Sequence, residues 1–179
     1  MKARRPIFHA LLATLLATPV GAADLDALYD RLAAASEQEA PRLEAEIEGE
    51  WQKSGSASMD LLLRRGQEAL AAGDITAAID HFSAAIDHAP DFTEAYNSRA
   101  AAFFQEGEFG PAITDIGQVL RLDPRHFTAI TGLALMLEEM DRPKEAIEAY
   151  RAALAIHPHL PGVRDSIDRL TADTDGQEI

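Results

Sequence analysis

Apolar positions along residues 59–160 recur at the spacing of amphipathic helices, and the predicted helices come in pairs. In the first pair, apolar and small residues follow helical spacing from Met59 until Gly73 interrupts the pattern. Asp74 is well suited to cap a second helix, whose apolar face continues until Pro90 ends it. The pattern therefore predicts two helices, joined by a glycine turn and closed by a proline.

The same pattern returns every 34 residues, which indicates an internal repeat. Small residues at matching positions let the two helices of a unit approach closely, and large apolar residues fill the space between units. The matching columns are Gly66, Ala100 and Ala134; Ala78, Ala112 and Ala146; Phe82, Ile116 and Tyr150; Ala85, Val119 and Ala153; and Pro90, Pro124 and Pro158. Since one helix pair cannot bury its apolar face alone, we expect three stacked units, at 59–92, 93–126 and 127–160.

Shorter amphipathic segments flank the repeats and are expected to cap them. Two helical faces within residues 24–57 predict a helical hairpin that covers the exposed end of the first repeat, with Trp51 in its core. Residues 161–171 predict a capping helix, and residues 172–179 are expected to form a disordered tail. The apolar positions of these caps are Leu25, Leu28 and Leu32; Leu43, Ile47 and Trp51; and Val163, Ile167 and Leu170.

Residues 1–23 have the pattern of a cleaved secretory signal. Three basic residues precede an apolar run from Ile7 to Ala17, and small residues follow it. The run is shorter than the roughly 20 apolar residues that span a bilayer, so cleavage after Ala22 or Ala23 is favoured over an uncleaved anchor. This pattern predicts a periplasmic or secreted protein, with no membrane insertion after cleavage.

Composition narrows the classes of partner and of chemistry. Lys and Arg number 16 against 30 Asp and Glu, which gives a formal net charge of −14. Such a surface repels phosphate backbones and anionic lipid, so we expect a neutral or basic protein partner and no nucleic acid. The absence of cysteine excludes disulfides, Cys-ligated zinc and a thiol nucleophile.

The repeated columns resemble the signature of the tetratricopeptide repeat family, which places a large early residue, a small one, an alanine, a large apolar residue and a proline in this order. The resemblance covers residues 59–160 and implies an all-α, right-handed solenoid of three helix pairs. Leu62 and Ile130 depart from the early aromatic residue that Tyr96 keeps, and Asp141 replaces a turn glycine. The resemblance also implies a scaffold for protein–protein interaction.

By the same resemblance, a partner-binding groove is lined by the first helix of each repeat. The groove mixes amides, hydroxyls and apolar groups, which suits an extended peptide. Its residues are Leu63, Arg64, Gln67 and Leu70; Asn97, Ser98, Ala101 and Phe104; and Thr131, Leu135 and Glu138. Family members that hold the C-terminal carboxylates of cytosolic heat-shock chaperones use Lys, Asn and Arg at five groove positions. The matching residues here are Leu63, Gln67, Ser98, Thr128 and Gly132, so that activity is not expected.

Arg65 and Arg99 occupy the same repeat position and have two interpretations. Either they form a basic site inside the array, or each guanidinium pairs with a carboxylate on the neighbouring helix. Pairing is favoured, because a buried arginine needs a counter-charge, and Asp115 is the predicted partner of Arg99.

Candidate catalytic residues are few. His157 and His159 flank Pro158 without an acidic third ligand, and His81 and His88 lie too far apart in sequence to chelate one ion. No phosphate-binding loop, serine-nucleophile motif or HExxH motif occurs. We therefore predict a non-catalytic adaptor of the cell envelope, without cofactor or metal, that binds a peptide in its groove. The alternatives are a self-associating structural subunit and, less favoured, a hydrolase or metal enzyme.

Overall fold

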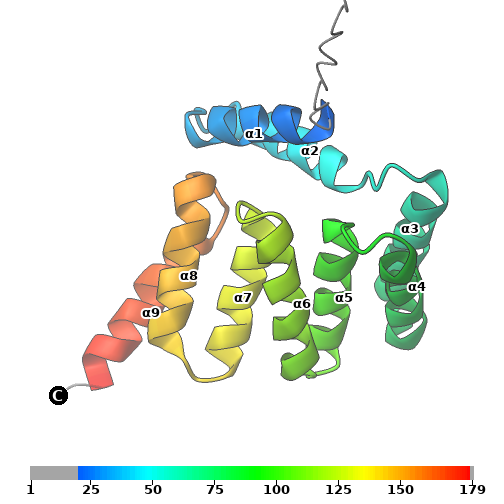
Figure 1. Ribbon diagram of the computed structural model, residues 1–179. Coiled ribbons are helices and arrows are strands. Elements are labelled where there is room, and N and C mark those ends of the chain that lie inside the picture. Colours follow the sequence, from blue (N-terminus) through cyan, green and yellow to red (C-terminus); the bar gives the residue numbers. More distant parts are fainter. Residues whose placement is uncertain (1–19, 178–179) are drawn as a thin grey trace, which may run out of the picture.

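The computed structural model describes residues 20–177, and the side chains of residues 25–174 within them. This part of the chain is all-helical, which confirms the predicted fold class (Figure 1). The helices are α1 (Val20–Ala33), α2 (Ala40–Trp51), α3 (Ala57–Ala71), α4 (Ile75–His88), α5 (Thr93–Gln105), α6 (Phe109–Leu122), α7 (Phe127–Glu139), α8 (Pro143–Ile156) and α9 (Val163–Gln177). Most of the predicted signal segment, residues 1–19, lies outside the described residues, and α1 includes its last four residues.

Helices α3 to α8 form three helix pairs stacked side by side, and α9 packs against α8 at one end (Figure 1). The large residues of the repeat columns, Phe82, Ile116 and Tyr150, are buried as predicted. Gly66 shows why the pairs need small residues. A Cβ atom built on Gly66 would lie 2.3 Å from Cε1 of the Phe82 ring, so α3 and α4 pack at a distance that only glycine permits.

The turns that join the two helices of each pair share the same backbone conformation in all three repeats. Gly73 and Gly107 have φ angles of 80° and 77°, and Asp141 adopts φ 57° at the matching position of the third repeat. In each turn the residue after this position donates its backbone N–H to the carbonyl five residues earlier, at 2.9 Å; in the third repeat Arg142 donates to Leu137. Asp141 therefore fills a position whose backbone favours glycine.

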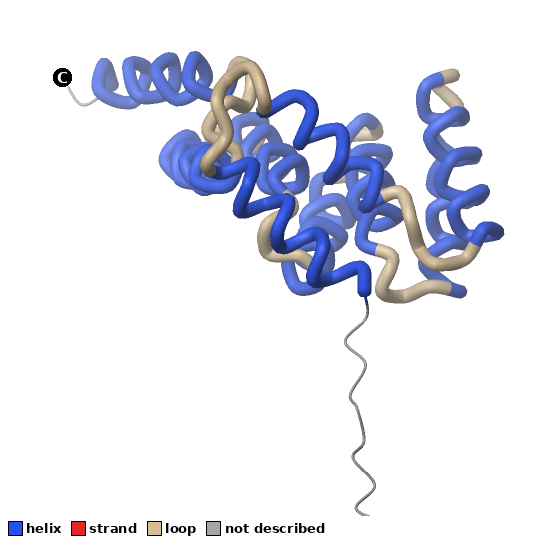
Figure 2. Tube along the Cα trace, turned by 90° about the horizontal axis from the view of Figure 1, so that it is seen from above, coloured by secondary structure: helices blue, strands red, loops and turns tan. Residues whose placement is uncertain are grey.

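The hairpin of α1 and α2 does not cover the exposed end of the first repeat, so that part of the prediction is wrong. It lies across the turns that join one repeat to the next, over the ends of the repeat helices (Figures 1 and 2). Its buried residues pack with Phe127 at the start of α7, with Ile156 at the end of α8 and with Leu160 in the segment that follows α8. The reason is that these later turns carry apolar side chains that the repeats leave uncovered, and Gly55 (φ 81°) permits the chain to turn before α3.

The C-terminal helix is longer than predicted. Helix α9 continues to Gln177, through residues that the sequence assigns to a disordered tail. The hydroxyl groups of Thr171 and Thr174 donate to the carbonyls of Ile167 (2.7 Å) and Leu170 (3.0 Å), one turn earlier. These polar residues therefore satisfy their hydrogen bonds within the helix and do not interrupt it.

Candidate functional site

The first helices of the three pairs, α3, α5 and α7, contact one another in order and form one surface of the solenoid. Residues 34 apart occupy equivalent positions, so Gln67, Ala101 and Leu135 form a row across these helices. Leu135 is 45% exposed, Ala101 is exposed and Gln67 is half-buried. Leu70 and Phe104 are half-buried at the next equivalent position, where Phe104 packs edge-on against Phe109. We call the surface formed by Gln67, Leu70, Ala101, Phe104 and Leu135 the first-helix face.

Two of the predicted groove residues belong to the interior. Leu63 has no exposed surface and packs with Phe82 and Phe92, because the turn before α5 covers it. Ser98 is 7% exposed, and its hydroxyl donates to Glu94 at 3.2 Å. Neither side chain can contact a ligand on the surface.

Asn97 and Thr131, two more of the predicted groove residues, already form hydrogen bonds inside the protein. The amide of Asn97 donates to the Glu94 carboxylate at 3.3 and 3.4 Å. Thr131 donates to the backbone carbonyl of Phe127 at 2.8 Å. Arg64 is exposed.

Glu138, the last of the predicted groove residues, links three helices. It accepts hydrogen bonds from the Tyr150 hydroxyl (2.5 Å) and from Arg169 of α9 (2.6 Å). Burial of the phenol, followed by its bond to Glu138, raises the pKa of Tyr150, so this hydroxyl remains a neutral donor. Glu138 thus stabilises the junction of α7, α8 and α9.

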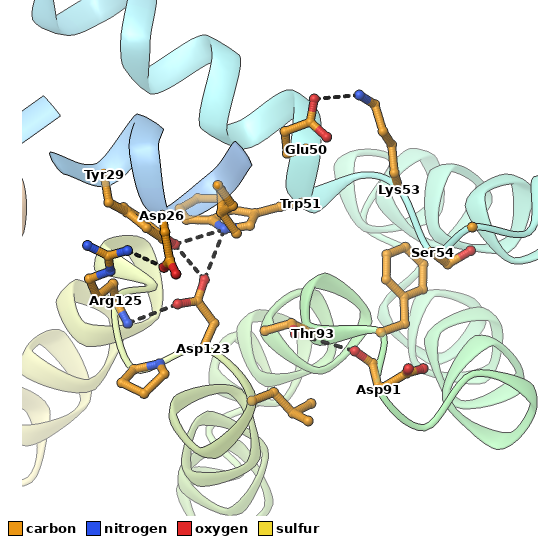
Figure 3. A pocket seen from close by; sticks show the side chains of 15 residues that line it. Asp26, Tyr29, Glu50, Trp51, Lys53, Ser54, Asp91, Thr93, Asp123 and Arg125 are labelled. Carbon is orange, nitrogen blue, oxygen red and sulfur yellow. Dashed lines mark hydrogen bonds and ion pairs between the residues drawn. The ribbon is translucent and has the colours of Figure 1, made fainter. Parts of the chain in front are cut away.

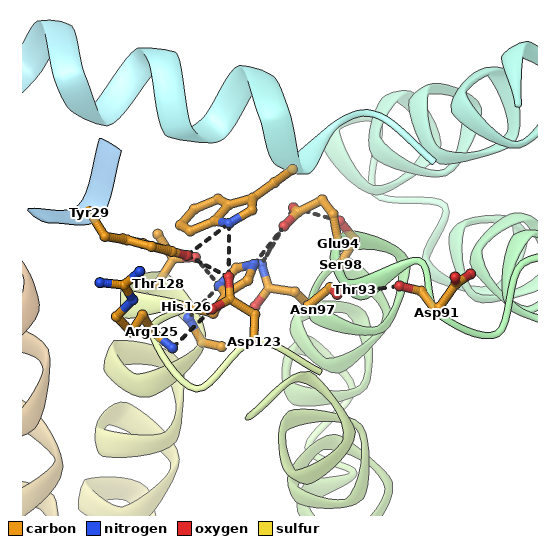
Figure 4. A network of polar contacts seen from close by, with 12 residues as sticks. Tyr29, Asp91, Thr93, Glu94, Asn97, Ser98, Asp123, Arg125, His126 and Thr128 are labelled. Atoms are coloured by element: carbon orange, nitrogen blue, oxygen red, sulfur yellow. Dashed lines mark hydrogen bonds and ion pairs between the residues drawn. The ribbon is translucent and has the colours of Figure 1, made fainter. Parts of the chain in front are cut away.

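The hairpin lies over a buried polar network that sequence reasoning missed (Figure 4). His126 is fully buried and accepts the Ala129 N–H at Nδ1, which caps α7. Since Nδ1 is an acceptor, the proton of the neutral ring is on Nε2, which lies 3.2 Å from the Glu94 carboxylate. The Trp51 ring stacks on the His126 ring with centroids 3.8 Å apart and an 8° angle between the planes. Trp51 is buried, as predicted, and its contacts with His126 and Phe127 hold the hairpin against the start of α7.

A second group of contacts fixes the hairpin to the turn between α6 and α7 (Figure 3). The Tyr29 hydroxyl donates to Asp123 at 2.5 Å, and the Trp51 indole N–H lies 3.3 Å from the same oxygen. Burial and the bond to Asp123 raise the pKa of Tyr29, so the phenol stays protonated and donates. Arg125 forms ion pairs with Asp26 and Asp30 of α1, and its guanidinium lies 4.5 Å from the centroid of the Tyr29 ring.

A cavity of about 750 Å³ opens beside these contacts. Its walls come from α1, from the end of α2 and the segment that follows it, and from residues 91–93 and 122–125 at the two inter-repeat turns (Figure 3). We call it the turn cavity. It requires the packing of the hairpin on two inter-repeat turns, so no local pattern in the sequence could indicate it.

Arg99 and Asp115 form the predicted ion pair. The Nε and Nη2 atoms of Arg99 lie 2.7 and 2.8 Å from the two carboxylate oxygens, and Nη1 donates to Ser83 at 3.0 Å. The bond to Asp115 raises the pKa of Arg99. The pair joins α4, α5 and α6, and it presents no basic site on the surface.

The inter-repeat histidines have structural contacts. His157 accepts the His159 N–H at Nδ1 (3.3 Å), and its Nε2 lies 3.4 Å from Glu44. The ring of His159 lies 2.9 Å from the Ala35 carbonyl. Within the described part of the chain, no three His, Cys, Asp or Glu side chains are arranged to hold a metal ion. Among residues 20–177, none of the helices has the length and apolar character needed to cross a membrane.

Comparison with known proteins identifies similar sequences and structures. A family model described as tetratricopeptide repeat matches residues 63–115 and 107–161, together more than half of the chain. A TPR repeat-containing protein of Rhizobium etli is 33% identical over 135 residues, which cover 75% of this chain and 66% of that protein. The chain spans less than two thirds of the length of that protein and of other curated relatives that it matches.

Two solved structures illustrate the similarity of fold. The TPR2B domain of yeast Sti1, solved in a pHsp70 complex, superposes with a TM-score of 0.60 at 25% identity, covering 68% of this chain and 99% of that domain. The first TPR domain of Spaghetti (RPAP3), bound to the HSP90 peptide SRMEEVD, gives a TM-score of 0.64 at 19% identity, covering 67% and 95%. The second likeness supports the fold alone.

Proposed function

The chain belongs to the tetratricopeptide repeat family of protein-interaction scaffolds, and on this premise we propose that it is a non-catalytic adaptor that binds an extended peptide segment of a partner protein on the first-helix face. The observation that carries the proposal is the 45% exposure of Leu135, which lies on this face in a row with Ala101 and Gln67. Leu135 offers an apolar contact, and Gln67 at the other end of the row offers hydrogen bonds, to one extended chain that passes over Ala101.

The chemistry of the face indicates which peptide it accepts. The five positions that form a cationic clamp in chaperone-binding relatives carry no Lys or Arg here, and two of them, Leu63 and Ser98, are buried. A net charge of −14 also repels an acidic segment such as the HSP90 peptide in the RPAP3 complex. The proposed partner segment is therefore neutral or basic, and its association should weaken as salt rises.

The N-terminal pattern supports an adaptor that acts in the cell envelope. Residues 1–23 combine a basic start, a short apolar run and small residues, which is the arrangement of an exported precursor. Expression in a Gram-negative host tests this: intact-mass analysis of the periplasmic fraction should show loss of 22 or 23 residues. Recovery of the full-length chain in the cytoplasm alone would contradict it.

A peptide-display selection followed by titration tests the binding function. The selected peptide is titrated against the wild type, Leu135→Ser and the control Leu61→Ser. Leu61 is a matched control because it is also an exposed leucine, at 40%, but it is outside the first-helix face. We expect Leu135→Ser to weaken binding at least tenfold and Leu61→Ser to leave it unchanged.

Two results would refute this function. One is a selection that yields no saturable ligand, and the other is equal affinity of both leucine variants for the selected peptide. A mass that rises with concentration, and that Leu135→Ser returns to the monomer value, would instead show self-association through this face.

A further inference from the structure

The turn cavity lies on the inter-repeat turns, on a different part of the fold from the first-helix face. Its volume of about 750 Å³ is within the range of about 300–1,000 Å³ that is typical of ligand sites. Its walls come from four separate segments, which the docking of the hairpin brings together (Figure 3). The cavity is therefore a property of the complete fold.

The carboxylates of the cavity outnumber its cations. Asp26, Glu50, Asp91 and Asp123 line it, against Lys53 and Arg125. Both cations are already paired: Lys53 lies 2.6 Å from Glu50, and Arg125 bonds to Asp26 and to Asp30. A phosphate or carboxylate ligand would have to break these pairs and approach the remaining acids.

Asp91 is the carboxylate that remains open to a ligand. Its side chain is exposed, and among the described residues it has neither a hydrogen bond nor an ion pair. Thr93 bonds to the backbone carbonyl of Asp91 and leaves both carboxylate oxygens unoccupied. A cation placed in the cavity can therefore pair with Asp91 without displacing an existing partner.

Apolar surface lies in the same cavity. Leu122, at the end of α6, is 38% exposed, and Leu25 of α1 is half-buried. A lysine or arginine side chain combines an aliphatic stem with a charged end, so its stem can cover Leu122 while its end reaches a carboxylate. The volume exceeds what one side chain fills, which favours a peptide segment over a free amine.

We propose that the turn cavity is a second binding site, which takes a basic peptide segment and places a lysine or arginine side chain between Leu122 and Asp91. It provides the adaptor with a contact separate from the first-helix face. The site recognises positive charge, whereas the first-helix face recognises an extended backbone with an apolar side chain.

Binding of a labelled, end-blocked Leu-Arg-Leu-Arg peptide, measured by fluorescence anisotropy at low salt, tests the proposal. Trp51 is the single tryptophan of the chain and lines the cavity, so its emission reports whether the peptide occupies this site. We expect saturable binding with a change in Trp51 emission, and at least tenfold weaker binding of a Leu-Glu-Leu-Glu peptide. Raising the salt to 0.5 M should weaken binding of the basic peptide severalfold.

Variants locate the site. Asp91→Lys should weaken binding of the basic peptide at least tenfold. Its circular dichroism should remain that of the wild type, because the Asp91 carboxylate has no partner to lose within the part of the chain that the structure describes. The matched control is Glu148→Lys, which makes the same charge change at an exposed position of α8 and should alter binding less than twofold. Leu135→Ser should leave this affinity unchanged, which separates this site from the first-helix face.

The proposal is overturned if the basic peptide does not bind, if Asp91→Lys binds as tightly as Glu148→Lys, or if Leu135→Ser removes the binding. The last result would place the basic peptide on the first-helix face and would leave the proposed adaptor function intact.

Discussion

Arg99 and Asp115 face each other across α5 and α6 with both carboxylate oxygens bonded to the guanidinium, at 2.7 and 2.8 Å. Their side chains are 20% and 6% exposed, so the pair is largely withdrawn from water. Removing one member leaves the other charge buried without a counter-charge, whereas replacing both by apolar residues of similar size removes the need for pairing.

The first prediction follows from this pair. Arg99→Met and Asp115→Leu should each lower the free energy of unfolding by about 3 kcal/mol, and the double variant should be closer to the wild type than either. Urea denaturation of the four proteins measures the coupling. A double variant that loses the sum of the two single losses would mean that the pair has no coupling energy of its own.

The second prediction concerns the contact between α3 and α4. Gly66→Ala should cost about 1–3 kcal/mol, because its new Cβ would overlap the ring of Phe82, which is fully buried and cannot move aside. Gly117 of α6 is exposed, and apart from its chain neighbours and the backbone of its own helix no atom lies within 4 Å of its Cβ position. Gly117→Ala should therefore gain up to about 1 kcal/mol from helix propensity. Chemical denaturation distinguishes the two, and the same sign for both would refute the packing argument.

The third prediction concerns the turn of the last repeat. Asp141 has φ 57°, so Asp141→Gly should raise the free energy of unfolding by about 1 kcal/mol. Gly107→Ala, at φ 77° in the equivalent turn, should lower it by a similar amount. Thermal unfolding measures both, and a lower midpoint for Asp141→Gly would show that the aspartate stabilises its turn by another route.

The fourth prediction concerns Trp51, which joins the hairpin to the repeats through its stack on His126 and its N–H near Asp123. Trp51→Ala should cost about 3–5 kcal/mol and should increase hydrogen exchange in α1 and α2 far more than in α3 and α4. Trp51→Phe keeps an aromatic ring and should give an intermediate result. A uniform rise in exchange across all helices would mean that the hairpin and repeats unfold together.

The fifth prediction is a dependence on pH. Partial burial, followed by the carboxylates of Glu44 and Glu94, raises the pKa of Glu48 above its ordinary value of 4.5. The folded state therefore binds this proton more tightly than the unfolded state, and the stability that it contributes is lost as pH rises through the raised pKa. Glu48→Gln should then be more stable than the wild type at pH 7, by about 0.3 kcal/mol because solvent screens the site. The difference should disappear near pH 4, and an equal gain at both pH values would contradict this account.

The repeats could be predicted from the sequence because their contacts are local and periodic. Spacing of 34 residues placed α3 to α8, their turns and the Arg99–Asp115 pair, since each depends on helices adjacent in sequence. The site residues were harder to predict than the repeats, because periodicity gives the direction of a side chain but does not show which other residues cover it. Leu63 has the direction of a groove residue, yet Phe92 and its turn bury it.

The position of the hairpin could not be predicted for a related reason. The contacts of Tyr29 and Trp51 with Asp123 join residues 94 and 72 positions apart and follow no period. His126 also gave no signal, because a single histidine after a repeat proline is usually solvent-exposed. Only the packed structure shows that it lies between Trp51 and Glu94.

The docking of the hairpin has a consequence for the order in which the protein is made. Helices α1 and α2 are synthesised before the repeats. Their apolar residues pack against Phe127, Ile156 and Leu160, which are synthesised more than a hundred residues after α1 begins. Helices α1 and α2 can pack against each other, but the surface on which their hairpin docks is incomplete until the third repeat has been synthesised. A solenoid whose units contact only their neighbours can fold as it grows, whereas the core around the hairpin of this chain is complete only after residues 127–160 have been synthesised.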